Sequence, residues 1–254
     1  MTDFYDLRAE LYDLAFDWDV DAEVEWLIAR LGSGCRSLLE PGCGSGRMFP
    51  AFIRRGVTVT GLDLSKTMLE RARQRLPKVR LTLHHADMSD FDLRETFDGA
   101  IIPINTFGYL LTDAQAKNHL HAVARHLKPG AKYLLQVDLR ELDRPADGSG
   151  AWEMEKDGVR LKTTWGGRGY DPASRVETQV SRFEVLSGPN RGLAFEDDHP
   201  IRLWDWKSWT ALLARTPFEQ TAAYDGNAKG RPEIALGQEL NRARLTWHEL
   251  VLRA

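Results

Sequence analysis

The sequence is poor in three features that often reveal where a protein works: cysteine, long apolar runs and net charge. Its two cysteines, Cys35 and Cys43, argue against a disulfide framework and show no metal-ligand spacing. No stretch approaches the roughly 20 apolar residues that cross a bilayer, and the acidic start MTDFYDLRAE is unlike a secretory signal. We therefore expect a cytoplasmic protein with no bound metal and no membrane partner.

The charge balance excludes an extended basic surface. The net charge is -3 and the isoelectric point is near 6.2, so no overall field attracts a polyphosphate backbone, and nucleic acid is a disfavoured partner. The 254 residues, 43% of them hydrophobic and 28% charged, are enough for one well-filled core, without a low-complexity tract or internal repeat. We expect a single globular domain, 1–254, that acts as a monomer or homodimer.

Apolar runs alternate with helix-spaced segments over the first half of the chain. The runs typical of buried strands are 36–40, 57–64, 79–87, 97–105 and 131–139. The helical segments are 45–56, 65–76 and 112–130. Ser65 is placed to cap the second helix, Thr112 and Gln115 to form a capping box, and Pro129-Gly130 to end the third helix. This alternation predicts a doubly wound α/β fold with a mostly parallel sheet.

The pattern changes after residue 139. A polar connector, 140–150, precedes two segments, 158–170 and 173–192, in which apolar and polar residues alternate as in half-exposed antiparallel strands. A helical segment, 204–216, and two alternating segments, 217–227 and 244–254, then suggest a closing pair of strands. We expect an antiparallel β insertion between the fifth parallel strand and the final helix.

The stretch LLEPGCGSGR, residues 38–47, joins the first strand to the first helix. Such a loop lies at the carboxyl edge of a parallel sheet, where ligands bind in open α/β folds. Its glycines follow the spacing G-x-G-x-G, whereas the dinucleotide fingerprint is G-x-G-x-x-G, and Glu40 precedes them. A carboxylate there repels a pyrophosphate and attracts an ammonium or sulfonium group.

Two further acids follow strands at the same edge. Asp63 ends the second strand, where its carboxylate can accept from both ribose hydroxyls, or else serve as a solvated acid or helix cap. Asp87 ends the third strand, where it can accept from an adenine amino group while the Met88 amide donates to the ring, or else be merely solvated. Together they predict an adenosine without phosphate.

From residue 38 to residue 139 the chain resembles the class I S-adenosylmethionine-dependent methyltransferases. The motifs that carry the resemblance are LLEPGCGSGR, VTGLDLS, HHADMSDF, FDGAIIPINTFGYL and LKPGAKYLLQVDL. The resemblance implies a Rossmann-like fold, S-adenosylmethionine as cofactor, and an N-terminal helix in which Tyr12 contacts the methionine carboxylate unless it is a core tyrosine. The implied cofactor-binding residues are Tyr12, Glu40, Gly42, Cys43, Gly44, Gly46, Arg47, Asp63, Leu64, Met68, Ala86, Asp87, Met88, Ile104 and Asn105.

Departures from one subfamily pattern narrow the substrate. Amino-directed DNA methylases resemble one another in an acid-or-Asn-Pro-Pro-aromatic element, and here that place reads IPIN. The inserted strands resemble the small-molecule branch, in which they form a substrate lid. The implied division is a helical cap (1–30), a cofactor-binding core (31–140), a lid (141–204), and a C-terminal helix with closing strands (205–254).

We therefore expect methyl transfer to an O or N atom of a small molecule. The candidates for a general base are His199 and Tyr109. An aromatic and cationic substrate pocket, or alternatively plain packing, is expected of Trp165, Arg168, Arg202 and Trp204. Five further histidines are expected to be structural: His84 and His85 in mid-strand, His119, His121 and His126 on a helix. Two alternatives stay open: a methyltransferase acting on protein or nucleic acid, and a non-catalytic domain that binds S-adenosylmethionine or a dinucleotide.

Overall fold

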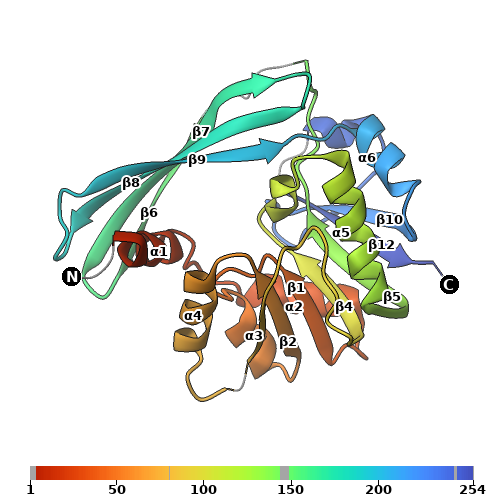
Figure 1. The fold of residues 1–254 in the computed structure, drawn as a ribbon, viewed down its shortest axis with the longest axis horizontal. Coiled ribbons are helices and arrows are strands. Elements are labelled where there is room, and N and C mark those ends of the chain that lie inside the picture. The colour runs from red at the N-terminus through yellow and green to blue at the C-terminus, as the bar shows by residue number, and fades with distance from the viewer. Residues whose placement is uncertain (1–3, 80, 144–148, 243–244, 254) are drawn as a thin grey trace. The chain divides into compact units, whose positions relative to one another are not determined.

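The chain folds into two compact units in this computed structural model, which describes residues 4–79, 81–143, 149–242 and 245–253 (Figure 1). The core unit comprises Val20–Leu142 and Arg202–Ala254. The hairpin unit comprises Met1–Asp19 and Asp143–Ile201. These bounds differ from the four-part division inferred from the sequence, which stays a prediction, and its residues 1–3 and 144–148 lie outside the described part of the chain.

A mostly parallel sheet runs through the core unit. Its strand order is β11-β10-β12-β5-β4-β1-β2-β3, in which the strands from β1 to β5 pair in parallel, while β12 and β10 are antiparallel to their neighbours. The strands are β1 (Ser37–Pro41), β2 (Thr58–Asp63), β3 (Thr82–His85), β4 (Phe97–Ile102), β5 (Leu127–Gln136), β10 (Phe218–Asp225), β11 (Glu233–Ile234) and β12 (Thr246–Leu252). The five predicted parallel strands and the closing pair are confirmed. The predicted place of His84 and His85 in mid-strand is wrong, because they are the last two residues of β3.

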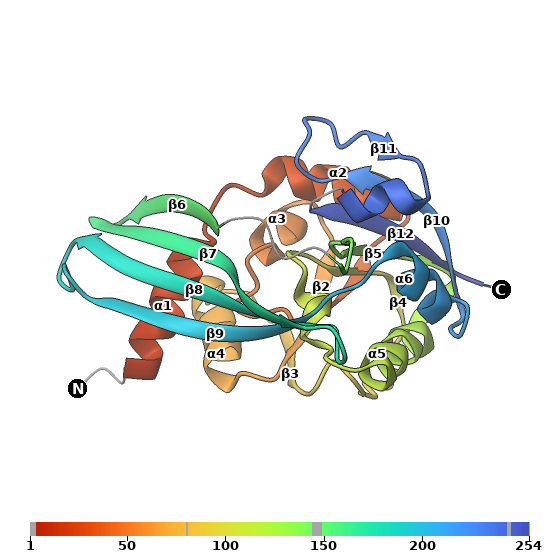
Figure 2. The ribbon, with the colours of Figure 1, turned by 90° about the horizontal axis from the view of Figure 1, so that it is seen from above.

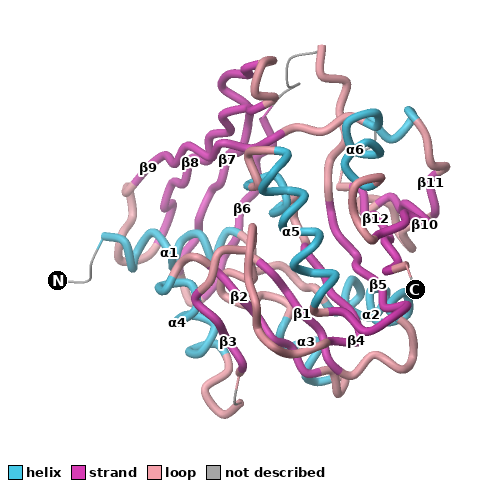
Figure 3. Tube along the Cα trace, turned by 45° about the vertical axis from the view of Figure 1, so that its right-hand side comes forward, coloured by secondary structure: helices cyan, strands magenta, loops and turns pink. Residues whose placement is uncertain are grey.

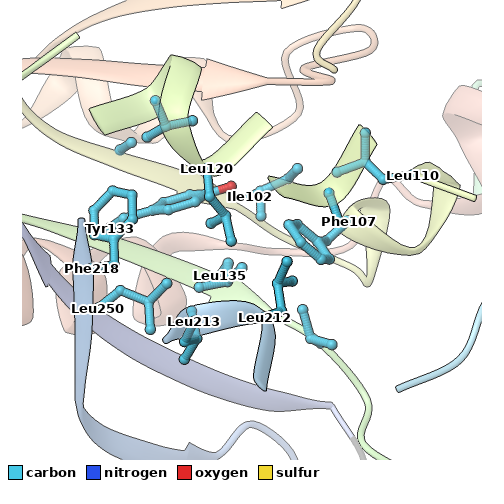
Figure 4. Close-up of a cluster of buried hydrophobic side chains, with 14 of the residues drawn as sticks. Ile102, Phe107, Leu110, Leu120, Tyr133, Leu135, Leu212, Leu213, Phe218 and Leu250 are labelled. Atoms are coloured by element: carbon cyan, nitrogen blue, oxygen red, sulfur yellow. The ribbon is translucent and has the colours of Figure 1, made fainter. Parts of the chain in front are cut away.

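Helices cover both faces of this sheet, as a doubly wound fold requires (Figure 3). They are α2 (Asp21–Leu31), α3 (Phe49–Arg54), α4 (Lys66–Arg75), α5 (Asp113–Arg125) and α6 (Trp206–Leu213), with short 3-10 turns η1 (Thr106–Tyr109) and η2 (Gln238–Arg242). The helices α2, α3 and α4 pack on one face. Buried side chains of α5 and α6 fill the other face, where Leu120, Tyr133 and Leu212 belong to one apolar cluster (Figure 4). The predicted fold class is confirmed.

Local signals set the beginnings of α4 and α5. The Ser65 side chain accepts a hydrogen bond from the Met68 amide, and Thr112 with Gln115 forms the predicted capping box. The third predicted helix, however, ends at Arg125 and not at Pro129-Gly130. His126 closes it because its Nδ1 bonds the Ala122 carbonyl, and the chain then enters β5.

The hairpin unit is a four-stranded sheet with one helix, α1 (Phe4–Ala15), across a face (Figure 2). Its strands, in sheet order, are β6 (Ser149–Lys156), β7 (Val159–Asp171), β8 (Val176–Ser187) and β9 (Ala194–Arg202). Leu11 and Ala15 of the helix pack against Phe183, and the Trp152 indole donates to the Ala15 carbonyl at 2.7 Å. The antiparallel insertion is therefore present, but β6 and most of β9 extend beyond the two predicted strands, and its role as a lid stays a prediction.

Trp204 lies in the apolar core of the core unit. Its side chain is 1% exposed, and its ring lies 6.1 Å from that of Phe107 and 6.2 Å from that of Trp209. We expect Trp204→Ala to lower the free energy of unfolding by about 3–5 kcal/mol, because it leaves a large cavity. Urea unfolding measures the change, and Leu236→Ala, at a 42% exposed position, serves as the control with a small effect. Equal changes in the free energy of unfolding for Trp204→Ala and Leu236→Ala would show that Trp204 does not lie in the core.

Candidate active site

The three loop glycines serve different needs. All have positive φ: 68° at Gly42, 53° at Gly44 and 66° at Gly46. A Cβ atom on Gly42 would lie 2.7 Å from Thr106 Cγ2, and one on Gly46 would lie 2.7 Å from the Phe49 ring. On Gly44 the nearest atom would be 3.4 Å away. Gly42 and Gly46 are thus required by packing within the protein, whereas a Cβ atom on Gly44 would only reach van der Waals contact with the Met68 methyl group.

Asp63, the last residue of β2, holds this loop in place. Its Oδ2 accepts from the Gly44 amide and its Oδ1 accepts from the Ser65 amide, each at 2.8 Å. One carboxylate therefore fixes both the glycine loop and the beginning of α4. Each oxygen keeps acceptor capacity for a further donor such as a ribose hydroxyl.

Glu40 is buried beneath the same loop. Its side chain is 3% exposed, and Oε2 has no hydrogen-bond partner among the described residues. Burial raises the pKa of Glu40 to about 8, and nearby Asp63 adds to the rise while Arg47 opposes it. A buried carboxyl oxygen without a donor is costly, and a cationic group placed there satisfies it.

The buried side chain of His119 holds the loop after β3 in place. His119 Nδ1 lies 2.7 Å from the Met88 carbonyl and Nε2 lies 2.8 Å from the Tyr133 hydroxyl. A carbonyl only accepts, so Nδ1 carries the proton and Tyr133 donates to Nε2. Burial lowers the pKa of His119 to about 4, which keeps it neutral. Asp87 follows the strand by two residues, and its Oδ1 accepts from the Ser89 amide at 2.7 Å.

The loop after β4 has an unusual backbone. Ile104 and Asn105 have φ of 48° and 56°, although a β-branched residue rarely adopts positive φ. The Ile104 amide donates to Gln136 Oε1 at 2.6 Å, and the Asp138 amide donates to Asn105 Oδ1 at 3.3 Å.

The structure brings most of the predicted cofactor residues together at the carboxyl edge of β1 to β4. Gly42 lies close to the loops after β3 and β4, because a Cβ atom on it would be 2.7 Å from Thr106 Cγ2 and 3.4 Å from the Met88 sulfur. Leu64 is 68% exposed beside Asp63, Met68 lies next to Gly44, and Cys43 is buried behind the loop. Ala86 donates its amide to the Asp63 carbonyl at 3.2 Å.

The two candidate bases differ in their surroundings. Desolvation raises the pKa of Tyr109, in η1, to about 12, so at neutral pH this phenol donates hydrogen bonds but does not accept a proton. His199 lies within β9. Its ring stacks on Trp165 at 4.7 Å, and Nε2 lies 2.7 Å from Ser181 Oγ. Burial lowers the pKa of His199, so the neutral, basic form prevails at neutral pH.

The other predicted contacts have partners within their own units. Tyr12 packs against Phe16, with ring centroids 4.7 Å apart. Arg168 forms ion pairs with Glu196 and Asp198 at the surface of the hairpin sheet. In the core unit Arg202, 7% exposed, donates to the Leu111 carbonyl and pairs with Asp113. The ion pairs of Arg168 and Arg202 and the burial of Trp204 are typical of residues that stabilise the fold. The proposed substrate-binding roles of these residues stay predictions.

Sequence reasoning missed two groups of polar residues. Gln136 and Asp138 were hidden in the apolar run YLLQVDL, where a polar residue in a buried strand was the available signal. Glu177, Gln179 and Ser181 alternate with apolar residues and so suggested an outward face, yet they are buried. Gln179 donates to Glu177 at 2.9 Å and accepts from the Trp165 indole at 2.7 Å.

Comparisons with known proteins agree with this geometry. Residues 38–130 match the family described as "Methyltransferase domain". A dTDP-3-amino-3,4,6-trideoxy-alpha-D-glucopyranose N,N-dimethyltransferase of Streptomyces venezuelae is 32% identical over 51% of this chain and 56% of its own length. The chain thus spans just over half of that relative. A dTDP-3-amino-3,6-dideoxy-alpha-D-glucopyranose N,N-dimethyltransferase of Streptomyces fradiae is 29% identical over 77% of each chain.

The fold has a solved counterpart as well. The structure of S-adenosylmethionine-bound CalS10, an amino pentose methyltransferase from Micromonospora echinaspora, superimposes with a TM-score of 0.71 at 22% identity, covering 91% of this chain and 89% of that one. Residues 38–130 thus match a methyltransferase domain, and the fold of the chain is that of solved S-adenosylmethionine-dependent methyltransferases. These similarities agree with the predicted class of enzyme and with S-adenosylmethionine as its cofactor.

Two features are absent from the described residues. No group of three or more His, Cys, Asp or Glu side chains is arranged to hold a metal ion. No helix in the described part of the chain combines the length and apolar character of a membrane-crossing segment.

Gly44 offers a clean test of where the cofactor meets the backbone. We expect Gly44→Ala to remain folded, with a loss of about 1–2 kcal/mol from its positive φ, and to lose at least tenfold in S-adenosylmethionine affinity. The matched control is Gly56→Ala, at φ 77° with open space around it and outside the loop, which should bind normally. Calorimetric titration compares the two. Equal affinities would mean that the glycine serves only the turn.

Glu40 should make cofactor binding depend on pH. With a pKa of about 8 in the folded protein, its carboxyl holds a proton at pH 7 that the unfolded chain has released, so its contribution to stability falls as pH rises toward 8. A bound ammonium lowers that pKa, so binding should release up to one proton at pH 7 and affinity should rise with pH. Titration calorimetry in two buffers of different ionisation enthalpy measures the proton count. Glu40→Gln should abolish the release, and a release that persists in this variant would exclude Glu40 as its source.

Proposed function

We propose that the protein transfers methyl groups from S-adenosylmethionine to the amino group of a nucleotide-linked amino sugar. The observation that carries the cofactor half is Glu40 Oε2, which is buried without a hydrogen-bond partner among the described residues, beside a glycine loop in which Gly44 is the least tightly packed of the three glycines. The two curated relatives act on dTDP-linked amino sugars, which supports the acceptor half.

The residues present fit the cofactor. Glu40 would receive its ammonium group, Asp63 the ribose hydroxyls, and the Asp87-Met88 turn the adenine edge, with Leu64 against the ring. His119 keeps that turn in place through the Met88 carbonyl. The cofactor, when bound, supplies a sulfonium methyl group that is already strongly electrophilic.

The protein's main task is then to position the acceptor. Holding a nucleophile in line at about 3–3.5 Å from the methyl carbon contributes up to about 7–11 kcal/mol of rate acceleration. An amine reacts only as the free base, so its nitrogen must give up one proton before or during transfer. His199, neutral at pH 7, is the candidate acceptor of that proton, and protonated Tyr109 is a candidate donor of an orienting hydrogen bond.

The hairpin sheet offers the chemistry that a hydroxylated acceptor needs. Along β8 its buried face changes from apolar Phe183 to polar Ser181, Gln179 and Glu177. With Trp165 and His199 on neighbouring strands these residues form a hydrogen-bonded cluster, in which Gln179 accepts from the Trp165 indole and Ser181 Oγ lies 2.7 Å from His199 Nε2. A small number of polar groups beside aromatic surface is typical of small-molecule sites. This supports the proposed lid as the acceptor-binding part.

The test is an acceptor screen followed by mass spectrometry. Purified protein with S-adenosylmethionine is offered a dTDP-amino sugar, the matching sugar with hydroxyl in place of the amine, a phenol and a peptide with a free N-terminus. We expect turnover of the amino sugar alone, with one and then two methyl groups added. Its rate should rise with pH through the amine pKa. Methylation of the phenol or peptide, with the amino sugar inert, would overturn the proposal.

A further inference from the structure

Three non-glycine residues of the core unit with positive φ lie in one hydrogen-bonded network. They are Ile104 (48°) and Asn105 (56°) after β4, and Leu245 (52°) before β12. Such conformations are strained and persist only where surrounding contacts fix them. These three strained residues lie at the carboxyl edge of the parallel strands.

Two side chains on the β5 segment connect these residues. Gln136, 4% exposed, accepts from the Ile104 amide at 2.6 Å and donates to the Leu245 carbonyl at 3.3 Å. Asp138 accepts from the Leu245 amide at 2.6 Å, and its own amide donates to Asn105 Oδ1 at 3.3 Å. The network therefore closes on itself, and every strained residue contributes a group to it.

The packing around Leu245 leaves little freedom. Its carbonyl also accepts from the Gly226 amide at 3.1 Å, and a Cβ atom on Gly226 would lie 2.0 Å from that carbonyl oxygen. The residue that follows Asn105 is Thr106, whose methyl group lies against Gly42 of the glycine loop. The network thus fixes the wall of the cofactor loop from the β4 side.

We propose that Gln136 and Asp138 are positioning residues for methyl transfer, acting through the strained Ile104-Asn105 turn that they hold against the glycine loop. This inference rests on the proposed function, since the turn lines the place where the sulfonium would lie. Neither residue needs to touch the substrate. Misplacement of a site wall by about 1 Å can cost about 10²-fold in rate without loss of binding.

The test compares Asp138→Ala and Gln136→Leu with the wild type. We expect kcat to fall at least tenfold while the Kd for S-adenosylmethionine, measured by calorimetry, stays within about threefold, because the loss lies in geometry and not in cofactor contacts. Asp138→Asn keeps the Oδ1 acceptor and should restore most of kcat. Asn105→Gly, which keeps the backbone conformation but removes the acceptor for the Asp138 amide, serves if either variant fails to fold.

The matched control is Asp98→Ala, at the amino ends of β1 and β4. Asp98 accepts from the Arg36 and Ser37 amides, so its loss should reduce stability but leave kcat unchanged. Amide exchange at Ile104 gives a readout independent of turnover: it should accelerate in Asp138→Ala and not in Asp98→Ala.

Three outcomes separate the claims. Unaltered exchange at Ile104 in Asp138→Ala would overturn the network. If Asp138→Ala and Asp98→Ala lose the same stability and both keep the wild-type kcat, Asp138 has only a structural role. If the wild type does not methylate the dTDP-amino sugar but binds the cofactor normally and protects the Ile104 amide from exchange, the proposed acceptor is wrong and the network stands.

Discussion

The carboxylate of Asp63 is the constraint on which the site depends. By accepting from the amides of Gly44 and Ser65, it ties the glycine loop after β1 to the beginning of α4. Both amides would otherwise be unsatisfied at the edge of a buried sheet. The loop can then keep three glycines in left-handed conformations and bury Glu40 beneath them. We propose that the buried Glu40 carboxyl then favours an ammonium group over a phosphate.

The fold could be predicted from the sequence because its signals are local. Continuous apolar runs mark strands buried on both faces, and residues such as Ser65 and Thr112 mark helix starts through their own side chains. The end of α5 was predicted wrongly because Pro129-Gly130 is a strong breaker signal, whereas the actual ending depends on His126 bonding back to Ala122. A competing local bond of this kind is not visible in a pattern of residue types.

The candidate site, too, has one part that local sequence signals predict and one part that they do not. Glycine spacing and strand-terminal acids pointed to Gly44, Glu40 and Asp63, which the structure gathers at one edge. The network of Gln136, Asp138 and Leu245 could not be predicted, because it joins segments more than a hundred residues apart in sequence. Its polar groups also lie where an apolar strand was expected. Long-range hydrogen bonds and positive φ at non-glycine positions can be seen only in the three-dimensional structure. Here they lie beside the candidate active site.

The central claim is that a buried carboxyl under a glycine loop recognises the cofactor through its ammonium group. The most direct measurement is the affinity of S-adenosylhomocysteine compared with its analogue that lacks the amino group. A hydrogen bond between charged partners is worth about 1.5–3 kcal/mol, so the analogue should bind at least about tenfold more weakly to the wild type. In Glu40→Gln this difference should largely disappear. Equal affinities of the two compounds for the wild type would contradict the assignment of Glu40 and, with it, the orientation of the cofactor in this site.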